Sequence, residues 1–230
     1  MTVETLENLK ARSHGISLGI FAADAGNMRE AALEASGWGC GIIHFDIMDG
    51  VFVPQMTGGA GFVKSIDVGA VRDVHLMIDN PEQHAAAFVA AGADIITVHA
   101  EAKGAAEAIM AIRAAAAAAE RPVLVGLGLV PDTSPDDVQG LLDMKPDMIL
   151  VLSLDPRTKN PPDISAACAK LTSLRERFGS NGPILAFDGG VTLKSIDEIA
   201  ACKPDMIVSG SAVFGAGDPS ASFNTMARSR

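Results

Sequence analysis

Several side chains that could bind a metal ion or move protons stand at the ends of apolar segments of this sequence. His44 and Asp46 close one such segment, His75 and His99 close two others, and Asp188 closes a later one. A buried charge without a partner is costly, so an apolar strand that ends in an ionisable residue requires a partner for that residue. The chemistry of these residue types is metal ligation, proton transfer or both.

The spacing allows two imidazoles and two carboxylates to converge. His44 and Asp46 are two residues apart, so on a strand both point to the same face. With His75 and Asp188 they would form a site for a borderline divalent ion such as Zn²⁺, Mn²⁺ or Fe²⁺. The alternative is that each histidine is a hydrogen-bonded residue of the core or rim, and both interpretations stay open on spacing alone.

Small residues after two of the apolar segments offer a place for an anion. Gly189 and Gly190 follow Asp188, and Gly210 and Ser211 follow the last apolar segment. Backbone N–H groups between a strand and a helix form a ready anion site. A tight turn is the more common use of such pairs. Gly189, Gly190, Gly210 and Ser211 are therefore candidate phosphate ligands.

Eight short apolar segments must position these side chains. Each is rich in Ile, Val and Leu and nearly continuous, as expected for parallel strands buried on both faces. The predicted strands are residues 16–21, 41–46, 72–77, 94–99, 123–128, 148–152, 184–188 and 206–210.

Segments between the predicted strands have helical character. Thr133 and Ser134 before two aspartates suit a helix start, and Pro81 suits a first helical turn. The predicted helices are residues 25–36, 81–91, 103–120, 134–142, 163–178 and 193–201.

This alternation predicts an α/β protein with one (β/α)₈ TIM barrel domain over residues 1–230. An open doubly wound sheet usually has fewer strands, and no G-x-G-x-x-G follows the first segment. The sequence KPDMI occurs at residues 145–149 and again at 203–207, which fits a barrel built by duplication. In such a barrel the reacting groups lie at the carboxyl ends of the strands, where the candidate residues are.

Charge and composition exclude several classes of partner. The 18 basic and 28 acidic residues give a formal charge of −10, which argues against nucleic acid and membrane surfaces as partners. No apolar run approaches the roughly 20 residues of a membrane-spanning helix, and the first residues lack the apolar centre of a signal peptide. The three cysteines, Cys40, Cys168 and Cys202, are odd in number and without C-x-x-C spacing. They predict reduced thiols in a cytoplasmic protein.

Five blocks of the chain, in order and with conserved spacing, resemble the ribulose-phosphate 3-epimerase family. Residues 44–57 read HFDIMDGVFVPQMT, similar to the family pattern H-x-D-x-M-D-G-x-F-V-P-N. The other blocks are DVHLMIDNPE at 73–82, GADIITVHAEA at 92–102, FDGGVTLKSI at 187–196 and VSGSAVFGAGDP at 208–219.

The resemblance implies an isomerase of pentose phosphate carbohydrate metabolism with a small-molecule ketose phosphate as substrate. It implies that Asp46 and Asp188 transfer the protons through an enediolate and that both, with His44 and His75, ligate the metal. Inverting a carbon beside a carbonyl requires proton removal on one face and return on the other, which two opposed carboxylates can do. It further implies a homo-oligomer, an apolar wall from Met48 and Met77 beside the centre, and substrate contacts from Ser153 and from the two glycine pairs.

The chain departs from the family pattern in two places. Gly19 and Ala22 stand where the family has serines in a P-S-I-L-S-A-D segment. The family's mobile S-x-N-P-G-F-G-G-Q loop is replaced at residues 153–162 by SLDPRTKNPP, which keeps Ser153 but lacks the glycines. Arg157 and Lys159 of this loop could clamp a phosphate or could simply be exposed basic residues.

The sequence therefore predicts a metal-dependent epimerase acting at carbon 3 of a ketose phosphate, with D-ribulose 5-phosphate as the leading substrate. The altered loop leaves open a different substrate such as a hexulose phosphate. A sugar-phosphate-binding barrel without turnover is a further alternative. A decarboxylase or aldolase is disfavoured because the third predicted strand, which includes Asp73 and His75, contains no lysine.

Overall fold

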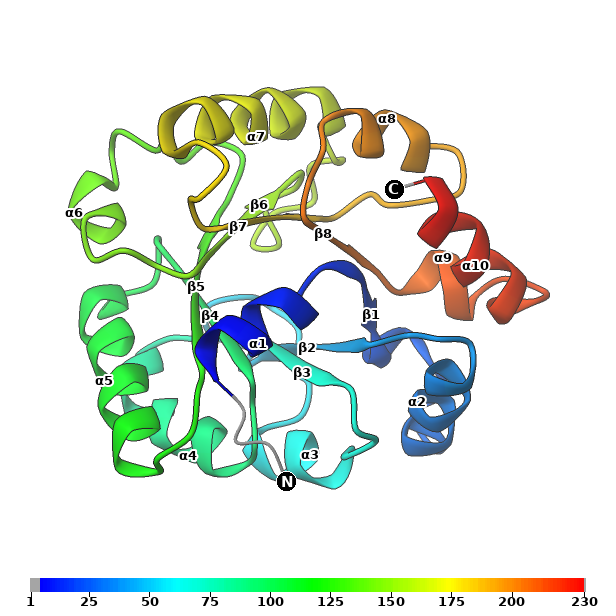
Figure 1. Ribbon diagram of the computed structural model, residues 1–230, viewed down its shortest axis with the longest axis horizontal. Helices are drawn as coiled ribbons and strands as arrows, with labels where there is room; N and C mark the ends of the chain where they lie inside the picture. Colours follow the sequence, from blue (N-terminus) through cyan, green and yellow to red (C-terminus); the bar gives the residue numbers. More distant parts are fainter. Residues whose placement is uncertain (1–4, 230) are drawn as a thin grey trace.

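The apolar segments form eight parallel strands that pair in chain order, and β1 also pairs with β8, which closes a barrel. The computed structural model describes residues 5–229. Helices surround the strands on all sides (Figure 1). The strands are β1 (Gly15–Gly19), β2 (Ile42–Met48), β3 (Val71–Met77), β4 (Ile95–His99), β5 (Leu124–Leu129), β6 (Met148–Leu152), β7 (Ile184–Asp188) and β8 (Met206–Ser209). The predicted (β/α)₈ barrel is confirmed.

The helices alternate with the strands, and further helices lie at both ends of the chain. Two short 3₁₀ segments, η1 (Ile20–Ala22) and η2 (Pro81–Gln83), follow β1 and β3. The α-helices are α1 (Leu6–Arg12), α2 (Met28–Gly37), α3 (Ala60–Ser65), α4 (Ala85–Ala90), α5 (Ala105–Ala118), α6 (Gln139–Leu142), α7 (Ile164–Phe178), α8 (Ile196–Ala201), α9 (Ser211–Phe214) and α10 (Pro219–Ser229).

Alternation along the strands separates two apolar layers. In β2, the side chains of Ile43, Phe45 and Ile47 belong to the layer between strands and helices. Ile42 belongs to the layer inside the barrel, where Leu9 of α1 packs against the first residues of the strands. In Figure 1, α1 lies across the barrel axis. The amino end of the barrel is therefore plugged, and chemistry is confined to the carboxyl end.

The repeated KPDMI sequence performs the same structural task twice. Lys145 and Lys203 both have a positive φ, 55° and 54°. Two residues later, Asp147 and Asp205 each accept a hydrogen bond from the backbone N–H of the preceding strand. Asp94 does the same before β4. The two copies of the repeat thus form the turns that lead into β6 and β8.

Several element boundaries differ from the prediction. The first strand ends at Gly19, because Ala23 N–H donates to the carbonyl of Ile20 and turns the chain into η1. The helix expected from Ser134 begins only at Gln139, because the Ser134 hydroxyl and carbonyl accept the N–H groups of Asp136 and Asp137 and form a turn instead. Helices α1, α3, α9 and α10 were not predicted.

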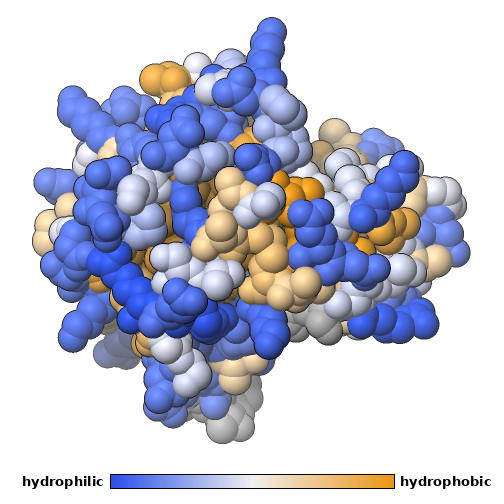
Figure 2. Space-filling view, turned by 90° about the horizontal axis from the view of Figure 1, so that it is seen from above, coloured by the Kyte–Doolittle hydropathy of each residue, from blue (hydrophilic) through white to orange (hydrophobic). Residues whose placement is uncertain are grey.

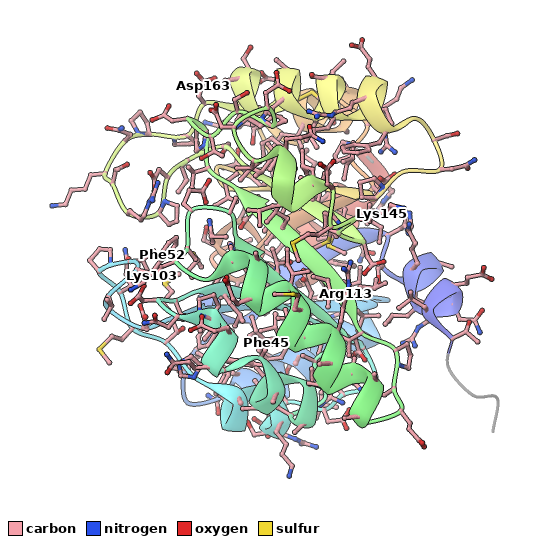
Figure 3. All side chains as sticks on the ribbon, turned by 90° about the vertical axis from the view of Figure 1, so that its left-hand side faces the viewer. Phe45, Phe52, Lys103, Arg113, Lys145 and Asp163 are labelled. Atoms are coloured by element: carbon pink, nitrogen blue, oxygen red, sulfur yellow. A yellow bond between two sulfur atoms is a disulfide. The ribbon has the colours of Figure 1, made fainter. Side chains whose placement is uncertain are left out.

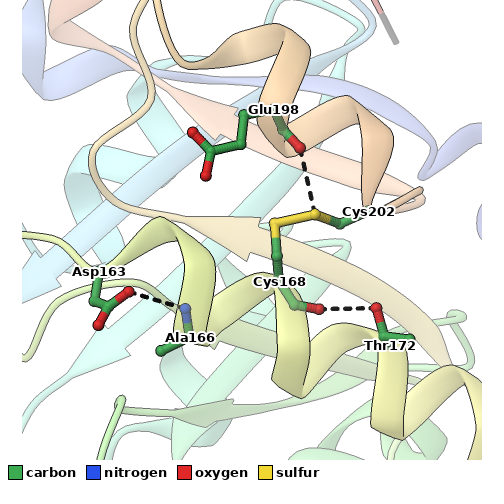
Figure 4. Close-up of a disulfide and its surroundings, with 6 residues drawn as sticks. All are labelled: Asp163, Ala166, Cys168, Thr172, Glu198 and Cys202. Carbon is green, nitrogen blue, oxygen red and sulfur yellow. Dashed lines mark hydrogen bonds between the residues drawn. A yellow bond between two sulfur atoms is a disulfide. The ribbon is translucent and has the colours of Figure 1, made fainter.

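The expectation of three reduced thiols is wrong. Cys168 of α7 and Cys202, which caps α8, form a disulfide with Cα atoms 5.5 Å apart (Figure 4). The two cysteines are 34 positions apart without a pairing signal in the sequence, and only the packing of α7 beside α8 brings them together. Cys40 remains a free, buried thiol.

The outer sides of the helices are largely hydrophilic, and Figure 2 shows one such face with apolar side chains gathered in a band across its middle. Among residues 5–229, no helix has the length and apolar character needed to cross a membrane.

Candidate active site

The pairing of β2 with β3 brings the strand-end side chains together. In this register Asp46 lies opposite His75, and His44 lies opposite Asp73. Side chains two residues apart on a strand share a face, so all four project into the barrel. Asp188 is the last residue of β7 and lies across the barrel mouth.

Four of the predicted site residues form one tight cluster. One potential ligand atom from each of His44, Asp46, His75 and Asp188 lies within 4.8 Å of all the others. The Oδ1 atom of Asp46 is 3.1 Å from His44 Nε2 and 3.3 Å from His75 Nδ1, and Asp188 Oδ2 is 3.6 Å from the same His75 atom. Both histidines are fully buried, whereas the carboxylates reach the cavity at the barrel mouth. The chain thus contains a possible metal-binding cluster.

A third carboxylate, that of Asp73, hydrogen-bonds to His44 on the side away from Asp46. Asp73 Oδ2 lies 2.7 Å from His44 Nδ1 and also accepts a hydrogen bond of 2.8 Å from the hydroxyl of Ser17. When the Nδ1–H of His44 donates a hydrogen bond to Asp73, the Nε2 atom of His44 faces the cluster. A carboxylate behind a ligating histidine is the usual support of such a ligand.

The donor set fits a divalent cation. His75 Nδ1 is buried and makes no hydrogen bond, yet it points at Asp46 and Asp188. A buried nitrogen without a partner is costly, and it faces two acceptor groups. A cation bound between the two imidazoles and the two carboxylates would give each of these ligand atoms a partner. This mixed nitrogen and oxygen set suits Zn²⁺, Mn²⁺ or Fe²⁺.

The two candidate acid–base groups have different electrostatic surroundings. Burial raises the pKa of Asp188, and the charge of Asp46 raises it further. Burial would also raise the pKa of Asp46, but His44 and His75 together outweigh burial and hold this pKa well below its usual value. Burial would lower the pKa of His44, but Asp73 and Asp46 outweigh it and hold the pKa well above 6.5.

A further buried pair lies beside the cluster. His99, the last residue of β4, is fully buried, and its Nδ1 lies 3.0 Å from Glu101 Oε2. Burial lowers the pKa of His99 to about 4. Burial would raise the pKa of Glu101, but its interactions with His99 and its hydrogen bonds with Thr133 and the backbone together outweigh burial, and the pKa falls to about 2. At neutral pH, His99 is therefore neutral and Glu101 is ionised.

The cavity beside the cluster is large enough for a sugar phosphate. Its volume is about 400 Å³, and Asp46 and Asp188 line one part of it. The remaining wall comes from the carboxyl ends of β1, β7 and β8 and the residues that follow them. It consists of three apolar residues, Phe21, Val191 and Val208, and of the small or hydroxylated residues Gly19, Ala22, Gly189, Gly190, Thr192, Ser209, Gly210 and Ser211. Both predicted glycine pairs thus face the same cavity as the carboxylates.

Ser153 and the two methionines take different positions. Ser153 is buried beside the glycines, where its hydroxyl would lie 2.8 Å from a Cβ built on Gly189, and it has no hydrogen-bond partner. Met77 is buried at the end of β3. Met48 lines a neighbouring apolar cavity with Met56 and Phe88.

Gly19, which stands where the family pattern has a serine, lies close to the backbone of Gly210. A Cβ at this position would lie 3.3 Å from the Cα of Gly210. A side chain at this position would therefore require a small shift of the Gly210 backbone.

The substituted loop lies at the barrel mouth, where the charge of Arg157 contributes to the lowered pKa of His99. Arg157 makes two hydrogen bonds with the carboxylate of Asp155, and its guanidinium lies 5.6 Å from the ring centre of Phe52. Lys159 is exposed, and neither basic residue lines the cavity. In Figure 3, Phe52 and Asp163 lie at the end of the barrel opposite α1.

Sequence reasoning named Asp73 and His99 as strand residues but did not recognise the roles of Asp73, Ser17 and Glu101. The signal was present, because Asp73 is two residues from His75, and Glu101 is two residues from His99. This signal was not decisive, because a two-residue spacing does not show which side chain hydrogen-bonds to which candidate ligand.

The fold and the cluster define a parallel-barrel enzyme with a possible metal centre at the carboxyl ends of its strands. The family model described as the ribulose-phosphate 3-epimerase family matches residues 15–214. The chain belongs to this family and is an epimerase.

Curated relatives match most of the chain. It is 35% identical over 222 residues to the ribulose-phosphate 3-epimerase of Mycobacterium leprae (strain TN), covering 93% of each protein. It is also 35% identical over 204 residues to that of Escherichia coli (strain K12), covering 86% of this chain and 88% of the relative. Among solved structures, 3-hexulose-6-phosphate synthase from Salmonella typhimurium superposes with a TM-score of 0.69 at 19% identity, covering 94% of this chain and 97% of that one. That likeness concerns the fold alone.

Proposed function

We propose that this epimerase inverts carbon 3 of D-ribulose 5-phosphate to give D-xylulose 5-phosphate. The observation that carries the proposal is the convergence of Asp46 and Asp188 with two buried histidines beside a cavity large enough for a sugar phosphate. The family relationship supports the same reaction.

Asp46 and Asp188 are the proton-transfer groups in this proposal. They reach the cavity from β2 and β7, so a substrate carbon between them would present opposite faces to the two carboxyls. The lowered pKa of Asp46 and the raised pKa of Asp188 suit one group to accept a proton while the other carries one. Which group begins depends on the direction of the reaction.

His44, Asp46, His75 and Asp188 would hold the divalent cation. When bound, Zn²⁺, Mn²⁺ or Fe²⁺ would supply Lewis-acid stabilisation of the negative charge that develops on the substrate's carbonyl and hydroxyl oxygens. Backbone N–H groups of Gly189, Gly190, Gly210 and Ser211, with the Ser153 hydroxyl beside them, would bind the phosphate end. Met77 would contribute to the apolar wall that limits water, and Met48 would do so from the adjoining cavity.

A hexulose phosphate is the second candidate substrate. The observation that favours it is the altered loop, in which Arg157 is paired with Asp155 instead of lining the cavity. The far end of the cavity is therefore built differently from the family pattern.

Solvent deuterium exchange tests both candidates. Metal-loaded protein is incubated in D₂O with D-ribulose 5-phosphate or with a ketohexose phosphate, and deuterium at carbon 3 is followed by NMR. We expect exchange together with formation of the carbon-3 epimer. Absence of exchange with every ketose phosphate would favour a sugar-phosphate-binding barrel without turnover.

We also propose that the protein acts in the cytoplasm as a homo-oligomer. Val51 and Met56, in the loop after β2, are 74% and 79% exposed although both are apolar. Sedimentation of the purified protein tests the assembly, and a monomer at micromolar concentration would contradict it.

A further inference from the structure

A second imidazole lies directly behind His75, on the side away from Asp46 and Asp188. The Nε2 atoms of His75 and His99 are 2.8 Å apart, whereas the ring centres are 4.9 Å apart and the planes differ by 24°. The rings therefore meet edge to edge through these two nitrogens. At this distance one Nε2 carries a hydrogen and the other accepts it.

Glu101 determines which nitrogen carries that hydrogen. Its Oε2 lies 3.0 Å from His99 Nδ1, and its Oε1 accepts the backbone N–H of Val130 at 3.1 Å. A carboxylate can only accept hydrogen bonds. Glu101 Oε2 therefore accepts a hydrogen bond from His99 Nδ1. With this hydrogen on Nδ1, the Nε2 atom of His99 is the acceptor of the bond between the rings, and His75 carries its own hydrogen on Nε2.

This arrangement leaves the Nδ1 lone pair of His75 free on the side of the cluster. Nδ1 is the buried nitrogen that makes no hydrogen bond and lies 3.3 Å from Asp46 Oδ1 and 3.6 Å from Asp188 Oδ2. In the opposite tautomer this atom would carry a hydrogen toward the two carboxylates and could not ligate a cation.

Glu101 is itself fixed from outside the barrel. The ammonium group of Lys170, on α7, donates to the carbonyls of Val130, Pro131 and Thr133, each at 2.8 Å. These bonds hold the loop whose Val130 N–H binds Glu101. The chain of contacts therefore runs from α7 through the loop after β5 to Glu101, His99 and His75.

We propose that Glu101 and His99 are positioning residues that set the tautomer of His75 and so prepare its Nδ1 as a metal ligand. Asp73 hydrogen-bonds directly to His44. The carboxylate that supports His75 is that of Glu101, which acts through the imidazole of His99. The inference rests on the metal centre of the proposed function, but the tautomer itself can be measured without metal or substrate.

Glu101→Gln is the decisive substitution. The Val130 N–H is a donor, so the side-chain oxygen of the introduced amide turns toward it and the NH₂ group turns toward His99. This geometry moves the hydrogen of His99 to Nε2 and the hydrogen of His75 to Nδ1. The size of the side chain is kept, the negative charge is removed, and the direction of both hydrogen bonds is reversed.

The test uses ¹⁵N-histidine NMR on the full-length protein stripped of metal and a chelator competition for Zn²⁺. In the wild type we expect His75 to carry its hydrogen on Nε2. In Glu101→Gln we expect the hydrogen on Nδ1 and a Zn²⁺ affinity lower by about 10-fold or more, the usual scale for loss of such a support.

Thr97→Val is the matched control. Thr97 lies two residues before His99 on the same strand, is fully buried, and its hydroxyl makes no hydrogen bond. Its substitution should change neither the tautomer nor Zn²⁺ affinity, and circular dichroism checks the fold of both variants.

Wild-type protein with the hydrogen on His75 Nδ1 would overturn the inference even if Glu101→Gln failed to fold. A folded Glu101→Gln variant with unchanged Zn²⁺ affinity would also overturn it. Failure of the proposed function is distinguishable, because the wild type would then bind no Zn²⁺ or exchange no substrate proton whatever the tautomer of His75.

Discussion

Asp46 and Asp188 are both aspartates at strand ends, yet their environments differ at the scale of single residues. Asp46 lies between two histidines, whereas Asp188 is more than 3.5 Å from His75 and has no comparable contact with His44 among the described residues. This asymmetry explains the opposite shifts of their pKa values. It also makes one group suited to accept a proton and the other to carry one.

Replacing either aspartate should abolish most turnover. We expect Asp46→Asn and Asp188→Asn to lower kcat by at least about 10²-fold, because a positioned acid or base contributes about 10²- to 10⁴-fold. Initial rates at saturating substrate are measured with the metal content of each preparation. Asp24→Asn, at an exposed aspartate after η1, is the control, and near-normal rates in both site variants would remove the assignment.

His99 should make the metal-free protein sensitive to acid. Burial lowers its pKa from 6.5 to about 4, so the unfolded chain binds more protons between these pH values. Its contribution to stability is full above pH 6.5 and is lost as the pH falls through about 4. We expect the wild type to lose about 2 kcal/mol more unfolding free energy than His99→Asn between pH 7 and pH 4.5. Urea unfolding with a chelator present measures this difference, and parallel losses in the two proteins would contradict it.

At the scale of elements, the loop of residues 153–162 is held at both ends. Ser153 N–H donates to the Asp188 carbonyl, and Asp163 N–H donates to the Ser153 carbonyl. The Asp163 side chain also accepts the N–H of Ala166 and so caps α7. The loop is thereby tied to the strand that carries Asp188.

Loss of this cap should destabilise α7. We expect Asp163→Ala to lower the free energy of unfolding by about 1 kcal/mol, because an N–H at the helix start loses its acceptor. Asp163→Ser, which keeps an acceptor, should lose clearly less. Equal stability of the alanine variant and the wild type in urea would show that the cap contributes nothing.

For the whole molecule, barrel closure places β2, β3, β4 and β7 around one mouth and α7 beside α8. The first arrangement assembles the site, and the second forms the Cys168–Cys202 disulfide on the outside. These cysteines are joined across 34 residues, so the bond restricts the unfolded chain substantially.

The disulfide should be detectable by thiol counting. Protein alkylated at cell lysis and then denatured should show one reactive thiol, Cys40, without reductant and three after reduction. The Cys168→Ser/Cys202→Ser variant should unfold with about 2–4 kcal/mol less free energy than the oxidised wild type. Its stability should match that of the reduced wild type. Three reactive thiols at lysis would contradict the bond.

The sequence by itself determined the barrel and the candidate ligands. Short apolar segments alternating with helices specify parallel strands, and in such a fold strand ends such as Asp46, His75 and Asp188 must meet at one mouth. These patterns are local and can be recognised in the sequence.

Only the tertiary structure decided which groups hydrogen-bond to the candidate ligands and which cysteines are bonded. The contact of Glu101 with Val130, the edge-to-edge meeting of His99 with His75, and the pairing of Cys168 with Cys202 join residues far apart in sequence. Such contacts depend on strand register and helix packing, which are fixed only when the whole barrel closes.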